Sequence, residues 1–242
     1  NAPIKIDMSH FVQSGDGYCG VSYFSDDEDS MLKLYNSFIA DNVIEQEKRI
    51  ATRAFQLGIS TPLAGAIVTT GTQKGILYER IKGKRSFSRA IADEPEKLEF
   101  YARRFARMCK ELHSTECDTV VFPSAVRNFE RELEHNKAFT EDQTKKILDF
   151  LHSVPVRTTC LHGDMHIGNV ITTGKEDLWI DMSDFSYGNP LFDFGMFYFV
   201  CHANNEKASR KIFHLSGASL LKIWNIFLRE YYQVNNEAEI EK

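Results

Sequence analysis

Three residues in the second half of the chain carry side-chain oxygens that could act together. Asp164 lies five residues before Asn169, and Asp181 follows a short apolar run that ends at Ile180. Carboxylate and carboxamide oxygens are hard ligands that suit Mg²⁺, which usually takes one or two ligands from a protein and completes its shell with water and phosphate oxygens. A further carboxylate beside such a site can accept a proton from a substrate hydroxyl. The pattern predicts phosphoryl transfer, with Asp164 as the base and Asn169 and Asp181 on the metal.

A hairpin is the element that would position these groups. The segments 169–173 and 178–182 are predicted as two short strands, and the turn between them is predicted over 174–177. In the register that this turn implies, Val170 faces Asp181. The carboxamide of Asn169 and the carboxylate of Asp181 would therefore come back side by side.

The run His162-Gly163-Asp164-x-x-x-x-Asn169 resembles the catalytic loop of the aminoglycoside phosphotransferase and choline kinase family. That loop is the small-molecule kinase counterpart of the catalytic loop of protein kinases. Ile180-Asp181, followed by a run over 188–193 that ends at Asp193, looks like the second metal motif of the family and its trailing structural aspartate. The segment 112–114, Leu-His-Ser, matches the family's helical signature.

The resemblance spans nearly the whole chain and implies an α+β, two-lobed, protein-kinase-like fold. An N-terminal antiparallel β-sheet lobe with one helix would cover residues 1–80, and residues 81–83 would form a hinge. A larger, mostly helical lobe would cover residues 84–242, with nucleotide bound in the cleft.

Short apolar runs separated by turn residues predict strands in the first lobe, and the 3.6-residue spacing of apolar residues predicts one helix there. In the second lobe, Asp93-x-x-Glu96 and Thr140-x-x-Gln143 have the form of capping boxes that open helices, and another long helix is predicted over 216–232. The strands are predicted at 9–13, 21–25, 31–35, 66–70 and 75–80, and the helix of the first lobe at 41–57.

A kinase-like fold needs a strand lysine on the α- and β-phosphates and a helix glutamate that holds this lysine. Lys33 lies within the apolar run 31–35. Glu47 interrupts the buried stripe of the helix at 41–57, whereas Glu45 falls on its polar face. A buried carboxylate is costly unless it is paired, so we expect Glu47 to face Lys33.

Two further segments are candidates for nucleotide binding. Gly15 and Gly17 lie between two predicted strands, where the family has a loop that covers the phosphates, and glycine lets the backbone approach a phosphate closely. Read alone, such a glycine-rich segment is most often only a hairpin. The resemblance also places adenine binding at the linker, through the carbonyl of Glu79 and the N–H of Ile81.

Four residues near the predicted base have supporting roles. His162 is expected to orient the loop, and His166 to stabilise the loop or to lie on the substrate side. Asp184 is expected to be a solvated or hydrogen-bonded turn acid, although it could touch metal or substrate. Asp193 lies among phenylalanines, so we expect it to be buried and to accept from backbone N–H groups. His162 and His166 could also form a zinc pair, but the intervening Gly-Asp disfavours the helix that such a pair requires.

Composition excludes several classes of protein. Hydrophobic residues make up 43% and charged residues 26% of the 242 residues, and the net charge is −5. These values are ordinary for a globular chain, and the net charge lacks the basic excess of a nucleic-acid binder. No apolar stretch is long enough to span a membrane. Five scattered cysteines without a paired spacing favour a reducing, cytoplasmic location over disulfides or structural zinc.

The sequence therefore predicts a phosphotransferase that uses ATP or GTP with Mg²⁺ and phosphorylates a hydroxyl of a small molecule. Aminoglycosides, choline or ethanolamine, sugars and nucleosides are all compatible acceptors, and acidic groups such as Asp184 would suit an amine-bearing one. One alternative is a catalytically silent, kinase-like protein that binds nucleotide or a partner. Another is a metal-dependent hydrolase that uses His162, Asp164 and His166.

Overall fold

The computed structural model describes residues 3–17, 19–203 and 205–234, and its contacts divide the chain into two compact units. The first unit comprises Asn1–Arg85 and Ile171–Ser183, and the second comprises Ser86–Val170 and Asp184–Lys242. These units differ from the predicted lobes mainly because the segment 171–183 belongs to the first unit. Within the described residues, no helix is long and apolar enough to cross a membrane.

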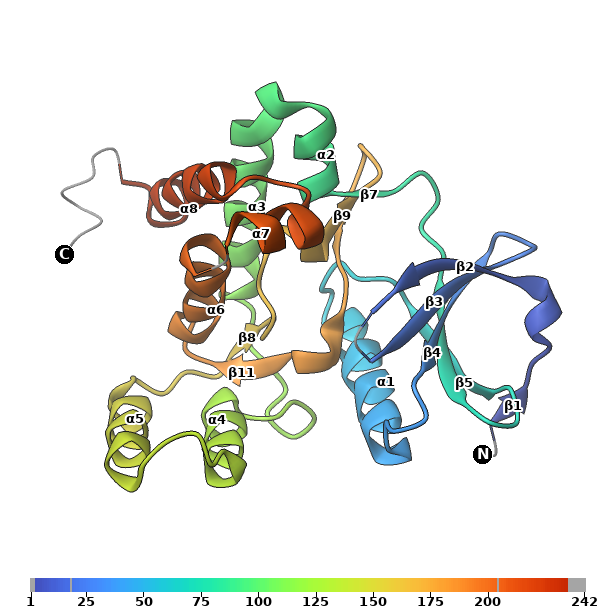
Figure 1. Ribbon diagram of the computed structural model, residues 1–242, viewed down its shortest axis with the longest axis horizontal. Helices are drawn as coiled ribbons and strands as arrows, with labels where there is room; N and C mark the ends of the chain where they lie inside the picture. The colour runs from blue at the N-terminus through green and yellow to red at the C-terminus, as the bar shows by residue number, and fades with distance from the viewer. Residues whose placement is uncertain (1–2, 18, 204, 235–242) are drawn as a thin grey trace. The chain divides into compact units, whose positions relative to one another are not determined.

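A six-stranded sheet dominates the first unit (Figure 1), in the order β1-β5-β6-β4-β3-β2. Neighbouring strands are antiparallel except β1, which runs parallel to β5. The expected antiparallel sheet is therefore mixed, because β1 adds a strand that was not predicted from the sequence. The strands are β1 (Ile4–Lys5), β2 (Phe11–Asp16), β3 (Gly20–Ser25), β4 (Ser30–Tyr35), β5 (Ala64–Thr69) and β6 (Lys74–Glu79).

The core of the first unit forms where alternating side chains of the central strands point to one face of the sheet. Leu32 and Leu34 of β4 are buried against Val68 of β5, as expected for a period of two. The helix α1 (Asp41–Gln56) packs on β5 and β6 and confirms the helix predicted over 41–57. Its buried face carries Ile44, Glu47, Ile50, Ala51 and Ala54.

The strands β9 (Val170–Thr172) and β10 (Asp177–Trp179) form a hairpin much later in the sequence than α1. Its turn is tighter than predicted, because the N–H of Thr173 donates to the carbonyl of Glu176 at 3.1 Å and Gly174 adopts φ 85°. The expected register, with Val170 opposite Asp181, is therefore wrong. Asp181 lies beyond the end of β10 and precedes a short 3₁₀ helix, η4 (Met182–Asp184).

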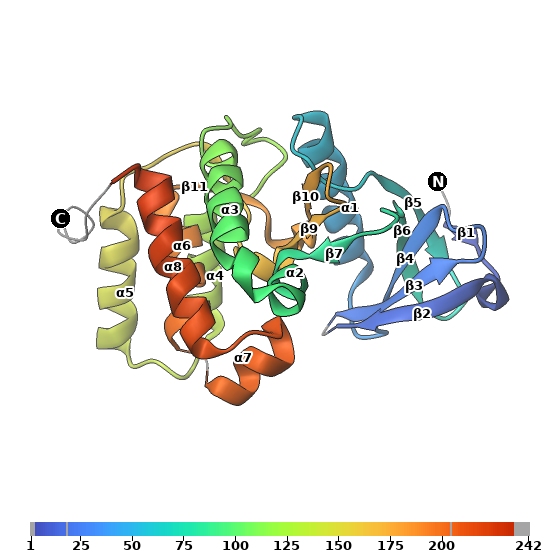
Figure 2. The same cartoon turned by 90° about the horizontal axis from the view of Figure 1, so that it is seen from above.

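Helices make up most of the second unit. The long helices α3 and α8 pack along each other (Figure 2), and α6 also packs on α8. Aromatic rings fill the space between these three helices, where Phe197 lies 5.1 Å from both Phe105 and Phe227 between ring centroids. The helices are α2 (Phe87–Asp93), α3 (Leu98–Leu112), α4 (Ala125–His135), α5 (Glu141–Ser153), α6 (Leu191–His202), α7 (Glu206–Phe213) and α8 (Gly217–Tyr232).

Shorter elements join these helices. The strand β7 (Arg85–Ser86) precedes α2, and a 3₁₀ helix η2 (Pro95–Lys97) leads into α3. The strands β8 (Thr159–Leu161) and β11 (Ser186–Gly188) pair antiparallel. Between β8 and β9 lies η3 (Ile167–Asn169), and η1 (Met8–His10) precedes β2 and replaces the first part of the strand predicted over 9–13.

One of the two predicted capping boxes is confirmed and the other is wrong. Thr140 and Gln143 bond each other's backbone N–H groups at the start of α5. Asp93 instead is the last residue of α2, because the side chain of Ser86 caps that helix and starts it earlier. Pro95 then opens η2, and a proline at this position suits the first turn of a helix.

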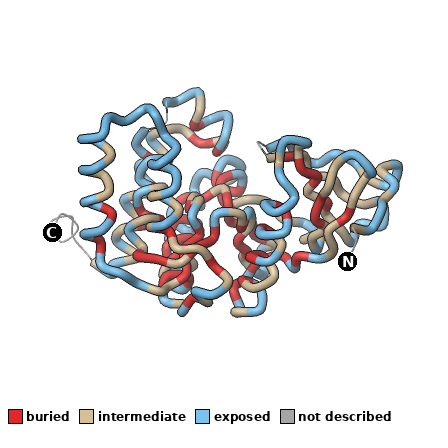
Figure 3. Tube along the Cα trace, turned by 90° about the horizontal axis from the view of Figure 1, so that it is seen from below, coloured by how far each residue is buried: buried red, intermediate tan, exposed pale blue. Residues whose placement is uncertain are grey.

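Buried residues follow the interior of each unit, while the outer faces of the helices are exposed (Figure 3). All five cysteines are free, and Cys109, Cys117, Cys160 and Cys201 are buried. Buried free cysteines behave as small hydrophobic residues.

Candidate active site

Lys33, Glu47 and Asp181 form a group in the first unit that we call the lysine cluster. Lys33 lies on β4, and its Nζ donates to Glu47 Oε1 at 2.7 Å and to Asp181 Oδ1 at 3.2 Å. The side chain of Glu47 is only 6% exposed, so its charge needs the lysine. The expected pair of Lys33 and Glu47 is present, and Asp181 joins it from the segment after β10.

Electrostatics keep Lys33 charged. Burial alone would lower the pKa of Lys33, but the carboxylates of Asp181 and Glu47 raise it above its usual value. The hydroxyl of Tyr78 on β6 also donates to Glu47 Oε1, at 3.2 Å. Burial, followed by the charge of Glu47, raises the pKa of Tyr78 well above its usual value. Tyr78 therefore keeps its proton and acts as a donor to Glu47.

Asp181 has a backbone conformation that is rare for a residue other than glycine, with φ 58°. Such left-handed conformations cost free energy and persist where the surroundings impose them, often at functional sites. Local anchors are present on both sides. Upstream, Trp179 N donates to Ser60 O at 2.8 Å, and downstream Ser183 Oγ lies 3.4 Å from Asp181 Oδ1. The strained backbone aims this carboxylate at Lys33.

Asp164 lies in the second unit, on the loop between β8 and β9 that we call the aspartate loop (residues 162–169). The side-chain Nδ2 of Asn169 donates both to Asp164 O, at 2.9 Å, and to Asp164 Oδ2, at 3.0 Å. Burial alone would raise the pKa of Asp164, but its contacts with His166 and Asn169 bring the pKa below its usual value. The carboxylate is therefore ionised and can accept a hydrogen bond from a hydroxyl.

Asn169 and Asp181 have the donor atoms that suit a magnesium ion. Because both hydrogen bonds of Asn169 to Asp164 use Nδ2, the carboxamide oxygen is the atom that can bind a metal. Asp181 adds a carboxylate, and these hard oxygen donors match Mg²⁺. Asn169 belongs to the second unit and Asp181 to the first. Their expected joint role stays a prediction. No group of three or more His, Cys, Asp or Glu residues in the described part of the chain is arranged to hold a metal.

The two histidines of the aspartate loop are held in different ways. His166 Nδ1 accepts from Gly168 N at 3.1 Å, and its Nε2 lies 3.4 Å from Asp164 Oδ2. Its ring packs edge-on against Phe213 at 5.1 Å. His162 is fully buried. His162 follows β8 directly and His166 caps η3, so the two do not share the helix face of a zinc pair.

Asp193 on α6 holds the start of the aspartate loop. Its Oδ2 accepts from His162 N and its Oδ1 from Gly163 N, each at 2.8 Å. Asp193 is 0% exposed, as expected from its phenylalanine neighbours. Burial alone would raise the pKa of Asp193, but His113 and His162 together lower it. The carboxylate therefore stays charged and fixes two successive backbone N–H groups.

Close backbone packing fixes the same part of the loop. Gly163 has φ 83° and lies against Asp184, so that a Cβ at this position would come within 2.1 Å of Asp184 O. Only glycine fits there without a shift of the backbone. Asp184 itself is exposed at the end of η4, where it was expected as a turn acid.

The glycines proposed near phosphate lie in the hairpin of β2 and β3. The pairing of these strands shifts register at Gly15, which is a β-bulge. Gly17 N then donates to Gly20 O at 2.9 Å. Residue 18 lies outside the described residues. A role in binding phosphate stays a prediction for both Gly15 and Gly17.

The two linker residues proposed to bind adenine follow one another closely. Glu79 ends β6 opposite Ser30, and its N–H donates to Leu63 O at 3.0 Å. Ile81 comes two residues later, after Arg80, whose guanidinium stacks over the ring of Phe24 at 4.1 Å. The adenine roles of Glu79 and Ile81 stay predictions.

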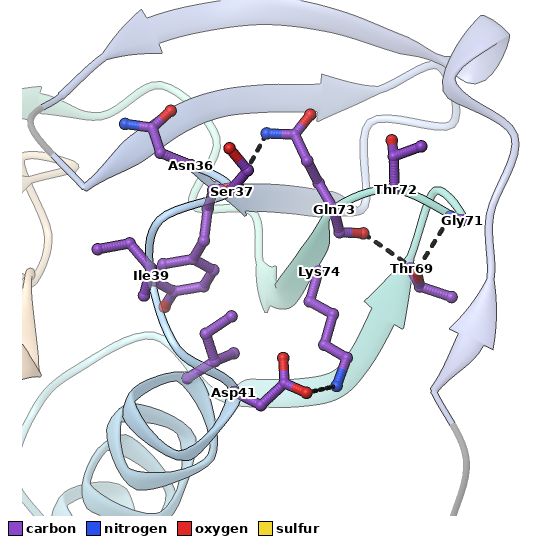
Figure 4. A pocket seen from close by; sticks show the side chains of 11 residues that line it. Asn36, Ser37, Ile39, Asp41, Thr69, Gly71, Thr72, Gln73 and Lys74 are labelled. Carbon is purple, nitrogen blue, oxygen red and sulfur yellow. Dashed lines mark hydrogen bonds and ion pairs between the residues drawn. The ribbon is translucent and has the colours of Figure 1, made fainter.

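A cavity of about 170 Å³ opens elsewhere in the first unit, between the segment that leads into α1 and the turn between β5 and β6 (Figure 4). Its one lysine, Lys74, is paired with Asp41 at 2.5 Å. The cavity lining does not include Lys33, Glu47 or Asp181. Since its charges neutralise each other and none of the predicted residues lines it, the cavity is not the candidate active site.

Sequence reasoning missed two tyrosines that contact this machinery, Tyr78 and Tyr231. On the sheet, Lys33 pairs with Ile76 and Met31 pairs with Tyr78. Tyr78 therefore lies on the same face as Lys33, which a prediction of strand register would have found. Tyr231 contacts His113 from α8, and no spacing in the sequence signals this contact.

A family model described as the phosphotransferase enzyme family matches residues 15–222. No curated protein sequence matches the chain.

Three solved structures with a similar fold are a type VIII aminoglycoside-3'-phosphotransferase, an aminoglycoside phosphotransferase from Streptomyces rimosus in complex with ADP and streptomycin, and a choline/ethanolamine kinase family protein from Mesorhizobium loti. Their sequence identities to the chain are 16%, 13% and 16%, and their TM-scores are 0.64, 0.59 and 0.56. The matches cover 96%, 91% and 96% of this chain and 90%, 86% and 72% of the other chains. At these identities the likeness shows a kinase-like fold, as expected from the sequence.

Proposed function

The chain belongs to the phosphotransferase enzyme family, and from that premise we propose that it is an ATP- and Mg²⁺-dependent small-molecule kinase. It transfers the γ-phosphate to a hydroxyl group of its acceptor. The observation that carries this proposal is the aspartate loop. There an ionised Asp164 is held by Asn169 through two hydrogen bonds. Asp193 fixes the start of the same loop by accepting from two of its backbone N–H groups.

Asp164 is assigned to the acceptor hydroxyl. Its lowered pKa makes it a weak base at neutral pH, so its main contribution is to orient the hydroxyl and to accept the proton late in the transfer. Orientation of this kind accounts for a large part of enzymatic rate acceleration. His166 supports the assignment because its Nε2 lies beside the same carboxylate oxygen.

Lys33 and Glu47 are assigned to the nucleotide. A lysine that keeps its charge and is held by a buried glutamate is what the α- and β-phosphates require. Gly15 and Gly17 are assigned to the phosphate-covering hairpin. The carbonyl of Glu79 and the N–H of Ile81 are assigned to adenine.

Asn169 and Asp181 are assigned as the residues that hold Mg²⁺. When bound, this ion neutralises negative charge on the phosphates. The hydrogen bond from Lys33 to Asp181 supports the assignment, because it ties the proposed metal ligand to the proposed phosphate ligand within one unit. Asp193 and His162 act on the reaction only by fixing the loop.

The acceptor is proposed to be a small hydroxyl-bearing molecule, in the range from aminoglycosides to choline, ethanolamine and sugars. Solved structures of similar fold include a streptomycin complex and a choline/ethanolamine kinase family protein. An amine-bearing acceptor is favoured by the exposed Asp184, which lies three residues after Asp181 in the sequence. The five free cysteines support a cytoplasmic site of action, where thiols stay reduced.

The test is nucleotide consumption across a panel of aminoglycosides, amino alcohols, sugars and nucleosides, with ATP and GTP supplied separately. Asp164→Ala is the control variant, and it should still bind MgATP. An acceptor that is phosphorylated by the wild-type chain and not by Asp164→Ala would establish both the activity and its substrate class. Equal turnover in the two proteins would overturn the assignment of Asp164. Nucleotide binding without turnover on any acceptor would instead favour a catalytically silent nucleotide-binding protein.

A further inference from the structure

A chain of hydrogen bonds runs from the last helix to the aspartate loop within the second unit. Tyr231 on α8 places its hydroxyl 3.0 Å from His113 Nδ1. His113, at the end of α3, places Nε2 at 2.9 Å from Asp193 Oδ2. The same carboxylate accepts from His162 N and Gly163 N. Tyr231 is thus linked to the loop that carries Asp164 through two side chains.

The two middle residues of this series of hydrogen bonds, His113 and Asp193, are buried. The side chains of His113 and Asp193 are 1% and 0% exposed. Because the pKa of Asp193 is lowered, its carboxylate is an acceptor and His113 Nε2 must carry the proton between them. That leaves Nδ1 of the imidazole for the Tyr231 hydroxyl. Burial also raises the pKa of Tyr231, so the hydroxyl keeps its proton at neutral pH.

Aromatic packing fixes the direction of the tyrosine. The ring of Tyr231 meets that of Phe194 edge-on at 4.9 Å, and it lies 5.7 Å from the imidazole of His113. Phe194 directly follows Asp193 on α6. The neighbouring Tyr232 also packs on Phe194, at 6.0 Å, but is 50% exposed. Tyr232 is therefore a natural control for Tyr231.

We propose that Tyr231 is a positioning residue for the proposed phosphotransfer, which acts through His113 and Asp193 to fix the aspartate loop. Two rotatable groups, the imidazole of His113 and the carboxylate of Asp193, must point correctly for both loop N–H groups to be bonded. Tyr231 holds the imidazole at the ring nitrogen opposite Asp193. Removing its hydroxyl leaves the ring in place but frees the imidazole to turn.

The first test needs no substrate and uses the full chain. Amide hydrogen exchange of His162 and Gly163 is measured in wild type, Tyr231→Phe and Tyr232→Phe. Loss of one neutral hydrogen bond changes an equilibrium by about fivefold, so Tyr231→Phe should exchange these two amides about fivefold faster. Tyr232→Phe should match wild type. Equal exchange in all three proteins would overturn the proposal, and so would equal acceleration in both variants.

The second test uses the acceptor identified in the panel and therefore rests on the proposed function. Tyr231→Phe should lower kcat about fivefold while the KM for ATP stays within twofold of wild type. In a His113→Gln background, whose carboxamide N–H can still donate to Asp193, adding Tyr231→Phe should have no further effect on kcat. If Tyr231→Phe instead lowers kcat by the same factor in that background as in wild type, Tyr231 does not act through His113.

The two tests separate the two proposals. If no acceptor is phosphorylated by wild type, the proposed function fails, while the exchange rates still decide whether Tyr231 fixes the loop. If transfer is found but neither exchange nor kcat responds to Tyr231→Phe, the positioning role alone is wrong.

Discussion

The lysine cluster of the first unit and the aspartate loop of the second hold their charged groups in different ways. In the lysine cluster, side chains bond side chains, and the exposed fraction rises from 6% at Glu47 to 49% at Asp181. The aspartate loop is held from α6, where Asp193, a carboxylate with no exposure, accepts from two backbone N–H groups of the loop. The first arrangement can exchange partners when a charged ligand arrives, whereas the second is part of the folded core.

This difference assigns different consequences to mutation. A change in the lysine cluster should act mainly on nucleotide binding, because Lys33 has two carboxylate partners and keeps one of them when the other is removed. A change at Asp193 or Gly163 should act mainly on the stability of the fold and, through loop geometry, on turnover. Four substitutions test this contrast, and they are given from the largest expected effect to the smallest.

Asp193→Asn should have the largest effect on stability. The amide cannot accept from both backbone N–H groups and His113 as a carboxylate does, and breaking a buried charged pair costs about 3–5 kcal/mol. Urea unfolding measures the loss. Because the pKa of Asp193 is lowered in the fold, its contribution is present above the unfolded pKa of about 3.9. The difference from wild type should therefore shrink as pH falls below about 4, and a pH-independent difference would contradict this account.

Gly163→Ala should be the next most damaging change. A Cβ would lie 2.1 Å from Asp184 O, and the residue would keep an unfavourable positive φ, so we expect a loss of about 2–3 kcal/mol. Gly174→Ala is the matched control, because Gly174 has φ 85° but no atom within 4 Å of its Cβ position. Thermal unfolding of the two variants separates the steric cost from the backbone cost. Equal losses would show that the contact with Asp184 is unimportant.

Glu47→Gln should weaken nucleotide binding rather than the fold. Lys33 would lose its 2.7 Å partner but keep Asp181, so the ammonium would be less well positioned for phosphate. We expect the Kd for MgATP to rise about tenfold, which is about 1.4 kcal/mol. Glu45→Gln, on the exposed face of the same helix, should leave the Kd unchanged. Isothermal titration of both variants measures the contrast, and unchanged binding in Glu47→Gln would break it.

Tyr78→Phe should have the smallest effect of the four. It removes one hydrogen bond to Glu47, at 3.2 Å, while Lys33 still holds the carboxylate. One such bond contributes about 1 kcal/mol, so the Kd for MgATP should rise about threefold to fivefold. Tyr23→Phe on β3 provides a matched loss of a tyrosine hydroxyl from the same sheet. A larger effect than that of Glu47→Gln would mean that Tyr78 contacts nucleotide itself.

The residues that were predictable from the sequence are those whose signal lies within one element. Glu47 interrupts an apolar stripe, and Asp193 lies among phenylalanines. Both patterns therefore predict a buried charge that needs partners. The turn at Gly174 was misplaced because a two-residue shift leaves the apolar pattern of so short a hairpin almost unchanged. The left-handed backbone of Asp181 also left no trace in the residue types.

Partners that come from distant parts of the chain were harder to predict. His113 belongs to the Leu-His-Ser segment that matched a helical signature, but its bond to Tyr231 joins positions 118 residues apart. The bond of Lys33 to Asp181 joins positions 148 residues apart. Such pairs depend on how whole elements pack, and a local pattern of residue types does not encode that packing.

The assignment of Ile171–Ser183 to the first unit has a consequence for how the protein is made on the ribosome. The six strands and α1 emerge early, but the hairpin that bonds Ser60 and supplies Asp181 to Lys33 is translated only after much of the second unit. At synthesis rates of about 5–20 residues per second, the nascent first unit waits on the order of ten seconds while Lys33 lacks one of its two carboxylate partners. Completion of the first unit is thus timed by translation of the second.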